Sequence, residues 1–306
     1  MHYIGIDGGG TKTTFSLFDE GLARVDTLRL PTSHFAQVGY EGMGRVLAEG
    51  VAELVARNHV GDYALGMGLA GFGEERQVRE RIEEVARRVA DGHAFELVND
   101  GQAARAAALD LSDGIVLVAG TGSIGFGVRG EREERCGGWG FQVGDEGSGW
   151  WIGRRLLGAF GRESDGRAPR GAVHDVLMRE LRLGEEYDVI GYARDELGDD
   201  RTKVAALGRL AAEAARLGDP EALAIYRDAA AELADLARVL VREVFGDREG
   251  LPVRTTYVGG VFRAGELVLE PLREALPERC DLVAPAHEPD MGAVLLLRRR
   301  LAGEGR

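Results

Sequence analysis

The stretch "YIGIDGGGTKTTFSLFD", residues 3–19, joins two strand-like segments through three consecutive glycines and a Thr-Lys-Thr sequence. A glycine-rich turn of this kind can bind phosphate groups through its backbone N–H groups. A Walker A loop and a dinucleotide-binding loop both lead into a helix, whereas "TTFSLF" alternates polar and apolar residues as a strand does. Thr11 also separates Gly10 from Lys12, which breaks the Walker A order. We therefore predict a β-hairpin phosphate loop.

The residues of this first loop suggest distinct roles in phosphate binding. Glycines allow the backbone to approach an anion closely, and the threonine and lysine after them add side-chain donors. The candidate phosphate-binding residues are Gly8, Gly9, Gly10, Thr11 and Lys12. Asp7, at the end of the incoming strand, is placed to hold a water molecule of a bound Mg²⁺ ion. A tight hairpin without a ligand would need similar glycines, so this loop alone does not establish nucleotide binding.

A second segment, "GIVLVAGTGSIGFGVRGE" at residues 114–131, repeats the order of strand, glycine-rich turn and strand. The repeat predicts two related halves, each opening on a hairpin. The second turn supplies three further candidate phosphate-binding residues, Gly120, Thr121 and Gly122. Two hairpins that face each other across a cleft could hold a polyphosphate from both sides. A third turn, with Gly259 and Gly260, follows a strand and could lie along an adenosine.

Composition narrows the classes of function. A chain of 306 residues exceeds one average domain, so two domains are expected. The net charge of −13 argues against a nucleic-acid or anionic-membrane partner, because a basic surface would be needed to bind either. Two cysteines are too few for a disulfide framework or a four-thiolate metal site. Without an apolar run of about 18 residues, no membrane span is expected, and we predict a cytoplasmic protein.

Hydrophobic periodicity predicts strands and helices that alternate along the chain, as in an α/β protein. The predicted strands are residues 2–7, 13–19, 23–30, 63–72, 94–100, two in 114–131, and 254–260. The predicted helices are residues 40–57, 74–90, 101–110, 202–217, 219–245, a segment after Gly265, and 291–301.

Four motifs together resemble the BadF/BadG/BcrA/BcrD-type ATPase family, within it the N-acetylglucosamine kinase branch. They are "IDGGGTKT", "ND" at 99–100, "GTGS" at 120–123 and "CGGWGFQVGDEGSGWWIG" at 136–153. The last is long and specific, and the resemblance covers nearly the whole chain. It implies an actin-like, ribonuclease H-like fold with two three-layer α/β/α domains, residues 1–112 plus 288–306 and residues 113–287. The domains are expected to close around sugar and ATP, with Mg²⁺ as a cofactor.

The resemblance also implies roles for individual residues. Thr11 and Thr121 match the ATP-contacting threonines, Ala205 matches a nucleotide-side position, and Asp100 matches the catalytic aspartate. The positions expected to contact sugar are Ser33, His34, Phe35, Asn99, Asp100, Ser123, Cys136, Gly138, Trp139, Gly140 and Asp145. The resembled kinases carry Asn and Trp where this chain has Ser33 and Phe35.

Two of these carboxylates have an alternative structural role. Asp100 precedes the predicted helix 101–110, and Asp145 precedes a further helix expected to start near Ser148; an Asp in such a place can cap the helix N-terminus. In the catalytic interpretation, Asp100 accepts the proton of a sugar 6-hydroxyl as it attacks the γ-phosphate. Asp145 would instead hydrogen-bond sugar hydroxyls, and for both residues a cap role is compatible with the functional one.

The function predicted first is an ATP-dependent hexosamine kinase acting on N-acetylglucosamine, followed by glucosamine or N-acetylmuramic acid. An activator ATPase that bridges subunits with an iron–sulfur cluster would need two suitably placed cysteines, and Cys136 and Cys280 are far apart in sequence. A non-catalytic sugar sensor would need a DNA-binding module such as a helix-turn-helix. The family resemblance suggests a homodimer.

Overall fold

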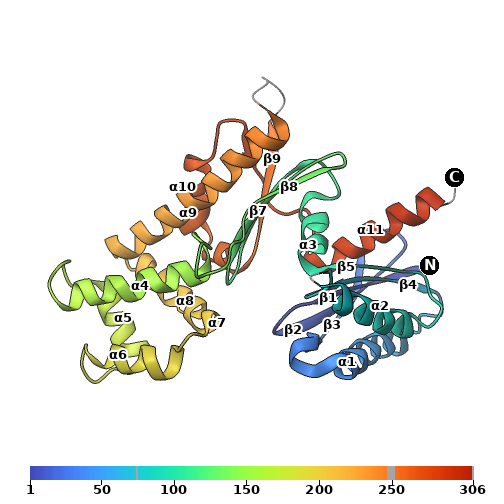
Figure 1. Cartoon of the computed structure of the whole chain (residues 1–306), viewed down its shortest axis with the longest axis horizontal. Coiled ribbons are helices and arrows are strands. Elements are labelled where there is room, and N and C mark those ends of the chain that lie inside the picture. The colour runs from blue at the N-terminus through green and yellow to red at the C-terminus, as the bar shows by residue number, and fades with distance from the viewer. Residues whose placement is uncertain (74, 247–251, 305–306) are drawn as a thin grey trace. The chain divides into compact units, whose positions relative to one another are not determined.

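The computed structural model describes residues 1–73, 75–246 and 252–304. The chain forms two compact units, which Figure 1 shows in cartoon form. Unit 1 contains Met1–Ser112 and Ala284–Arg306, and unit 2 contains Asp113–Val283. Each unit is built on its own five-stranded sheet with helices packed against it. The predicted α/β fold class is therefore confirmed.

The sheet of unit 1 has the strand order β3-β2-β1-β4-β5. Its strands are β1 (His2–Gly8), β2 (Lys12–Phe18), β3 (Arg24–Pro31), β4 (Tyr63–Leu69) and β5 (Phe95–Asn99). The first three strands are antiparallel neighbours, whereas β4 runs parallel to β1 and β5 runs parallel to β4. The carboxyl ends of β1, β4 and β5 therefore lie at the same edge of the sheet, the edge where α/β proteins bind ligands.

Helices cover both faces of this sheet. They are α1 (Phe35–Asn58), α2 (Arg76–Ala90), α3 (Asp100–Leu109) and α11 (Pro289–Glu304). Successive residues of a strand point to opposite faces. Ile4 accordingly packs in a cluster with side chains of α1 and α2, whereas its neighbour Tyr3 packs with side chains of α11. Unit 1 is thus a three-layer α/β/α arrangement.

The sheet of unit 2 has the strand order β10-β9-β6-β7-β8. Its strands are β6 (Gly114–Ala119), β7 (Ser123–Arg129), β8 (Arg132–Gly137), β9 (Val253–Val258) and β10 (Cys280–Leu282). The regular helices are α4 (Gly149–Ser164), α5 (Ala172–Glu180), α6 (Asp188–Tyr192), α7 (Arg201–Ala206), α8 (Gly208–Arg216), α9 (Pro220–Leu240) and α10 (Glu266–Ala275). Short helical turns lie at η1 (Ala193–Leu197), η2 (Val241–Phe245) and η3 (Gly260–Ala264).

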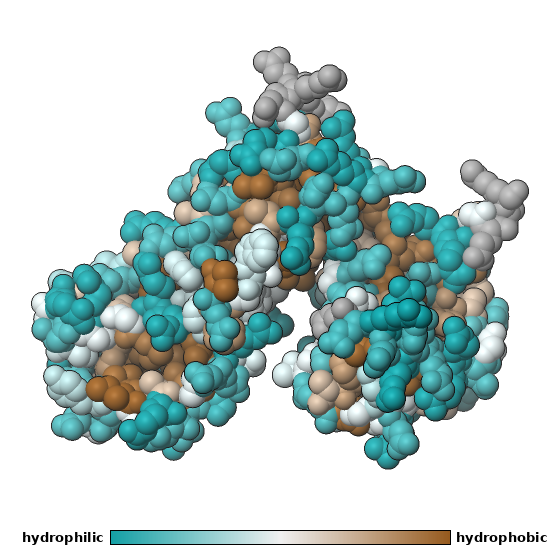
Figure 2. Space-filling model, in the orientation of Figure 1, coloured by the Kyte–Doolittle hydropathy of each residue, from teal (hydrophilic) through white to brown (hydrophobic). Residues whose placement is uncertain are grey.

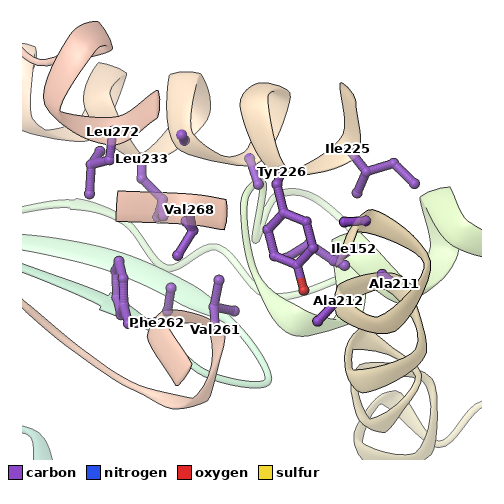
Figure 3. Packing of buried hydrophobic residues seen from close by; sticks show 14 of the residues in the cluster. Ile152, Ala211, Ala212, Ile225, Tyr226, Leu233, Val261, Phe262, Val268 and Leu272 are labelled. Carbon is purple, nitrogen blue, oxygen red and sulfur yellow. The ribbon is translucent and has the colours of Figure 1, made fainter. Parts of the chain in front are cut away.

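Side chains of α9 organise the apolar core of unit 2, as Figure 3 shows. Leu233 and Tyr226 of α9 pack in one buried cluster with Ile152 of α4 and Val268 of α10. The Tyr226 hydroxyl donates a hydrogen bond to the carbonyl oxygen of Gly208 at 3.1 Å. Burial raises the pKa of Tyr226 to about 12, so the hydroxyl remains a donor and ties α9 to α8.

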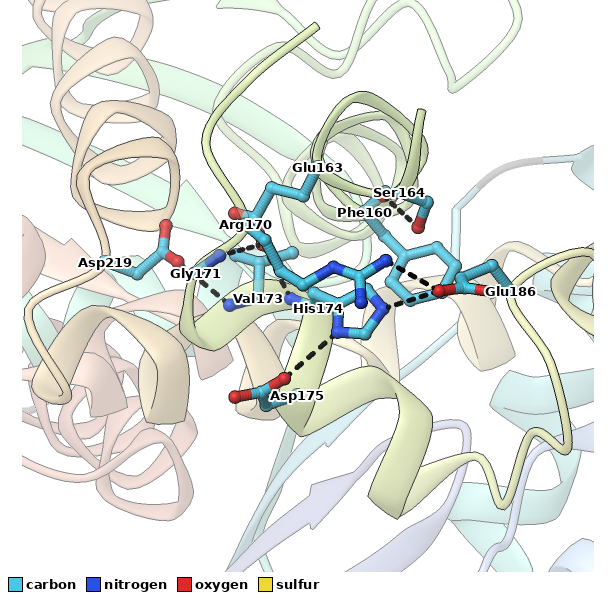
Figure 4. Close-up of polar contacts among 10 residues, drawn as sticks. All are labelled: Phe160, Glu163, Ser164, Arg170, Gly171, Val173, His174, Asp175, Glu186 and Asp219. Atoms are coloured by element: carbon cyan, nitrogen blue, oxygen red, sulfur yellow. Dashed lines mark hydrogen bonds and ion pairs between the residues drawn. The ribbon is translucent and has the colours of Figure 1, made fainter. Parts of the chain in front are cut away.

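Two buried carboxyl groups hold the start of α5, as Figure 4 shows. Glu163 accepts hydrogen bonds from the backbone N–H groups of Gly171 and His174, at 2.8 and 2.9 Å. Asp219, the N-cap of α9, accepts one from the N–H group of Val173 at 2.9 Å. The N-cap residue of α5 is Gly171, which has no side chain to supply the cap. The two carboxyl groups supply the acceptors instead.

Most of the surface in Figure 2 is hydrophilic, with smaller groups of hydrophobic side chains between the polar ones. The described part of the chain contains no helix that is both long and apolar enough to cross a membrane.

The predicted elements differ from the observed ones mainly in unit 2. The predicted helix 202–217 is two helices, α7 and α8, which meet near Leu207. The edge strand β8 was not predicted, because residues 132–135 are all charged and exposed and show no apolar alternation. Edge strands with exposed charges are a common way to prevent sheet-to-sheet association.

Candidate active-site residues in each unit

The first glycine-rich loop is the turn between β1 and β2. Gly8 lies opposite Thr13 in the antiparallel register, and the N–H group of Gly9 donates to the carbonyl oxygen of Lys12 at 3.1 Å. The predicted hairpin is therefore confirmed. Gly10 and Thr11 lie exposed at its tip.

Two side chains outside the hairpin hold its carbonyl groups. Thr32 Oγ1 donates to the carbonyl oxygen of Gly9 at 2.8 Å, and Gln37 Nε2 donates to that of Gly10 at 2.6 Å. With the carbonyl oxygens held in this way, the loop is fixed in one conformation. Gln37 was not among the residues predicted from the sequence. It lies in the first turn of α1, where nothing in the local pattern distinguishes it.

Asp7 occupies the end of β1, in a region with an excess of acidic groups. Burial, followed by the carboxylates of Asp100 and Asp290, raises the pKa of Asp7 to about 6, against the opposing effect of Lys12. A carboxyl group whose pKa is raised in part by neighbouring carboxylates favours a bound cation, which would relieve the repulsion. The acidic end of β1 is therefore suited to a cation.

Asn99 and Asp100 lie where β5 passes into α3. Asn99 is the N-cap of α3: its Oδ1 accepts from the N–H group of Gly101 at 2.9 Å, and its Nδ2 donates to the carbonyl oxygen of Phe72 at 3.1 Å. Asp100 Oδ1 also accepts from the Gly101 N–H group, at 2.9 Å. The cap position considered for Asp100 thus belongs to Asn99, and the shared N–H group orients the Asp100 carboxylate.

Ser33 lies inside unit 1, with only 1% of its surface exposed. Its hydroxyl accepts a hydrogen bond from Thr13 Oγ1 at 2.9 Å, and its backbone N–H group donates to the same Thr13 oxygen at 2.9 Å. The hydroxyl of Ser33 is therefore bonded to β2, directly behind the first loop.

His34 and Phe35 form a stacked series of rings at the start of α1. His34 is the N-cap, and its Nδ1 accepts from the N–H group of Ala36 at 3.2 Å. Its ring stacks on Phe35 with centroids 5.2 Å apart, and Phe35 stacks on Tyr40 at 5.3 Å. A Cβ atom at Gly71 would lie 2.6 Å from Phe35 Cε1, so Gly71 leaves space for this ring.

The second glycine-rich loop is the turn between β6 and β7, which again confirms the predicted hairpin. The N–H group of Gly120 donates to the carbonyl oxygen of Gly122 at 2.9 Å. The loop also accepts hydrogen bonds from the start of α4: Gly149 N–H to the Gly120 oxygen at 2.8 Å, and Trp150 N–H to the Thr121 oxygen at 3.3 Å. The first N–H groups of α4, which have no partner within the helix, therefore fix the loop.

Two predicted nucleotide-side positions from distant parts of the chain pack at this loop or at the start of α4 next to it. A Cβ atom at Gly149 would lie 3.2 Å from the Cβ atom of Ala205 on α7. Gly259 has φ of 125°, and a Cβ atom there would overlap the carbonyl group of Ala119, directly before the loop. Gly260 begins η3. Gly259 therefore packs against the β6–β7 turn, whereas Ala205 packs against Gly149, whose N–H group is bonded to that turn.

Asp145 carries a buried carboxylate against the same loop. The residue is 5% exposed and has the left-handed φ of 63°. Its Oδ1 accepts from the N–H group of Ser123 at 3.3 Å, and its buried Oδ2 has no hydrogen-bond partner within the described chain. Ser123 Oγ donates to the carbonyl oxygen of Glu146 at 2.6 Å. A buried acceptor without a donor is costly, and a hydroxyl group of a ligand could satisfy it.

The segment from Cys136 to Gly140 continues β8 towards Asp145. Burial raises the pKa of the Cys136 thiol, which disfavours a reactive thiolate. The N–H group of Gly138 donates to the Ser123 carbonyl oxygen at 3.1 Å. The Gly140 carbonyl oxygen accepts hydrogen bonds from the N–H groups of Val143 and Gly144. The Trp139 indole is 70% exposed, with the Arg135 guanidinium 5.8 Å from its ring centroid. Trp139 Cβ lies 3.3 Å from where a Cβ atom of Gly144, the neighbour of Asp145, would be, and its large exposed ring could contact a ligand.

The residues present are compatible with Mg²⁺ held largely by water and phosphate. The described residues include no group of three or more His, Cys, Asp or Glu side chains that could hold a metal ion. Mg²⁺ commonly binds through one or two carboxylates together with water and substrate phosphates. The raised pKa of Asp7 shows where such an ion would relieve charge repulsion.

Comparison with known proteins gives consistent matches along the chain. The sequence pattern of the BadF/BadG/BcrA/BcrD ATPase family matches residues 4–296. The chain is 30% identical to the N-acetyl-D-glucosamine kinase of Dictyostelium discoideum, over 96% of this chain and 97% of that protein. It is 28% identical to the N-acetylmuramic acid/N-acetylglucosamine kinase of Clostridium acetobutylicum, over 97% and 98%. A solved structure from Chromobacterium violaceum, named as a candidate N-acetylglucosamine kinase, matches with TM-score 0.73 and 27% identity, over 97% and 98%.

Proposed function

The chain belongs to the BadF/BadG/BcrA/BcrD ATPase family, and from this premise we propose that it is an ATP-dependent amino-sugar kinase. The motifs predict this family and its actin-like fold, and the comparisons confirm both. We propose that the γ-phosphate of ATP is transferred to the 6-hydroxyl group of N-acetylglucosamine. Both curated relatives that match nearly the whole chain carry N-acetylglucosamine in their names.

One structural observation carries the proposal most directly. Asp7 and Asp100 lie at the carboxyl ends of β1 and β5, near enough that the Asp100 charge raises the pKa of Asp7. The first glycine-rich turn follows Asp7 immediately. These positions support a proposal in which Asp100 is the base, Asp7 the cation position and the glycine-rich turn the phosphate loop, the parts that phosphoryl transfer requires.

In the proposed reaction, Asp100 accepts the proton of the sugar 6-hydroxyl as that oxygen attacks the γ-phosphorus. A new oxygen–phosphorus bond forms, the bond to the β-phosphate oxygen breaks, and ADP leaves with the electron pair. The Gly101 N–H group orients the Asp100 carboxylate for this step. Asp7 would hold Mg²⁺ through a water molecule, and the bound ion would neutralise phosphate charge.

Both units contribute binding residues in this proposal. We assign the first loop, Gly8–Lys12, and the second loop, Gly120–Gly122, to the phosphates, and Ala205, Gly259 and Gly260 to the nucleoside. We assign Asp145 to a sugar hydroxyl, because its Oδ2 atom is buried and has no donor among the described residues. The other sugar-contacting positions are Ser33, His34, Phe35, Asn99, Ser123, Cys136, Gly138, Trp139 and Gly140.

The two domains would be residues 1–112 plus 288–306 and residues 113–287. A cytoplasmic homodimer is also part of the proposal, supported by ATP as substrate and by the family resemblance.

A coupled ADP-release assay with a panel of sugars tests the function. We expect the highest kcat/KM with N-acetylglucosamine and lower values with glucosamine, N-acetylmuramic acid and glucose. A higher value with one of the other amino sugars would reassign the substrate within the same class. ADP release that no sugar stimulates would contradict the kinase function.

A further inference from the structure

A surface pocket of about 590 Å³ lies between α4 and the first turns of α9, in unit 2. Its volume is in the range of pockets that bind small molecules. The walls include the two indoles of Trp150 and Trp151 and the guanidinium groups of Arg154, Arg155 and Arg162. None of these residues belongs to the catalytic or binding groups assigned above.

The charges that line this pocket are mainly positive. The charged residues of its lining are four arginines, the fourth being Arg167, and one glutamate, Glu221. By contrast, a second pocket of about 550 Å³ beside α10 is lined by three glutamates and two arginines. The whole chain has a net charge of −13. A positive pocket on an acidic protein favours an anionic ligand.

Arg154 is the side chain best placed to bind such an anion. Arg155 is paired with Asp228, Arg167 is paired with Asp165, and Arg162 is 3.9 Å from Glu221. Arg154 makes no hydrogen bond or ion pair with any other described residue, and its side chain is exposed. A guanidinium group without a partner can bind the oxygens of a phosphate in a bidentate manner.

The indoles restrict the rest of the ligand. Both tryptophans are half-buried, and the Arg155 guanidinium lies 4.9 Å from the Trp151 ring centroid. An indole presents a broad apolar face together with an N–H donor. The apolar face of a sugar ring can pack on such a surface while its hydroxyl groups bond to nearby charged side chains. Indoles and guanidinium groups in one pocket therefore suit a sugar that carries a phosphate.

Trp150 also connects the pocket to the residues assigned to substrate. Its backbone N–H group donates to the Thr121 carbonyl oxygen of the second loop at 3.3 Å. Its ring packs edge-on against Phe141, with centroids 5.5 Å apart. Phe141 lies in the segment between Trp139 and Asp145. A ligand that moves Trp150 would therefore move both the phosphate loop and the sugar-binding segment.

We propose that this pocket is a regulatory site for a phosphorylated hexosamine, the product class of the reaction, and that its occupation lowers turnover. The site itself rests on the pocket residues, whereas the identity of the ligand rests on the proposed function. The active site would also bind this product, so two binding sites per chain are expected in the wild type.

The test is equilibrium binding of N-acetylglucosamine 6-phosphate to the full chain and to the Arg154→Glu variant. We expect two sites per chain in the wild type and one in Arg154→Glu. The control is Arg88→Gln, which changes an exposed arginine on α2 that has no partner in the described chain, and it should keep both sites. In kinase assays at saturating sugar and ATP, Arg154→Gln should weaken product inhibition about tenfold, the usual effect of one charge-assisted hydrogen bond.

An unchanged stoichiometry in Arg154→Glu, with unchanged product inhibition in Arg154→Gln, would overturn the proposal. Light scattering measures the oligomeric state as a second test of the proposal. If Arg154→Glu alters the oligomeric state and leaves ligand binding intact, the pocket is an interface between copies of the chain and the proposal is wrong. Binding does not require turnover. A protein that binds the sugar phosphate at Arg154 but phosphorylates no sugar would support the site and contradict the proposed kinase function.

Discussion

A Cβ atom on Gly122 would lie 2.7 Å from Oδ2 of Asp145, so the carboxylate occupies the space that any side chain at Gly122 would need. The two residues are far apart in sequence and come from different loops, yet Ser123, next to Gly122, also donates its N–H group to Asp145. The second glycine-rich loop and the carboxylate assigned to sugar are therefore built as one structure. The Asp145 carboxylate therefore itself requires that residue 122 carry no side chain.

Substitution of Gly122 by Ala should weaken sugar binding by displacing Asp145. The loss of one hydrogen bond to a charged group predicts a KM for the sugar about ten to a hundred times higher. ADP-release kinetics at varied sugar concentration measure this. Gly61→Ala is the control, because a Cβ atom there meets no atom within 4 Å. An unchanged KM for sugar in Gly122→Ala would contradict the assignment of Asp145.

Replacement of Asp100 by Asn should reduce kcat by about 10²- to 10⁴-fold, the usual contribution of a general base. Asn can still accept the hydrogen bond from Gly101, and Asn99 remains the N-cap of α3, so the fold should be retained. Single-turnover kinetics would show the loss in the chemical step with little change in KM. Asp110→Asn, at the opposite end of α3, is the matched control. Near-normal turnover in Asp100→Asn would remove Asp100 from the proposed mechanism.

The buried pair in Figure 4 predicts a pH-dependent stability in unit 2. Burial and the neighbouring Asp219 raise the pKa of Glu163. Because the pKa of Glu163 is higher in the folded chain than in the unfolded chain, protonation of its carboxyl group favours the folded state. This contribution to the stability is complete at low pH and is lost as pH rises through the folded pKa. Glutamine resembles the protonated form. Glu163→Gln should therefore gain stability relative to the wild type as pH rises from the ordinary carboxyl range to neutrality.

Urea unfolding at several pH values measures this difference. Glu163→Ala serves as the contrast, because it leaves the Gly171 and His174 N–H groups without their acceptor and should be destabilised by about 1–3 kcal/mol. If the difference between Glu163→Gln and the wild type does not change with pH, then Glu163 titrates alike in the folded and unfolded chains.

The sequence predicts the parts of this protein that depend on local pattern. The alternation after Gly10 identifies the hairpin, and the repeat at residues 114–131 identifies the second one. Strand β8 escapes prediction because its charged residues lie on an exposed sheet edge and show no alternation. The approach of Ala205 to Gly149 and of Gly259 to Gly120 follows only from the packing of α7, α4 and β9, which sequence spacing does not specify.

The same limit applies to hydrogen bonds between distant residues. The bond between Ser33 and Thr13 depends on the register of β2 against β3 and on the turn that follows. Asp145 has a left-handed backbone conformation although it is not glycine, and its Oδ2 atom has no hydrogen-bond partner in the described part of the chain. The family resemblance predicts Ser33 and Asp145 as sugar contacts. The partners that the two side chains have within the protein can be identified only in the folded structure.

The Asp7 carboxylate should lower the stability of the folded chain at neutral pH while it serves the proposed Mg²⁺ site. Its pKa is raised from 3.8 to about 6, so folding is favoured while the carboxyl is protonated and is penalised as pH rises through that interval. Two pKa units correspond to about 3 kcal/mol at neutral pH. Asp7→Asn removes this penalty and should unfold at higher urea concentration than the wild type at pH 7.5, with a much smaller difference near pH 4.

In the kinase assay, the same variant should require more Mg²⁺ for half-maximal activity, because it lacks the carboxylate proposed to hold the hydrated ion. A variant that is less stable than the wild type at pH 7.5 would show that the surroundings stabilise the Asp7 carboxylate. An unchanged Mg²⁺ requirement would show that Asp7 does not hold the cation.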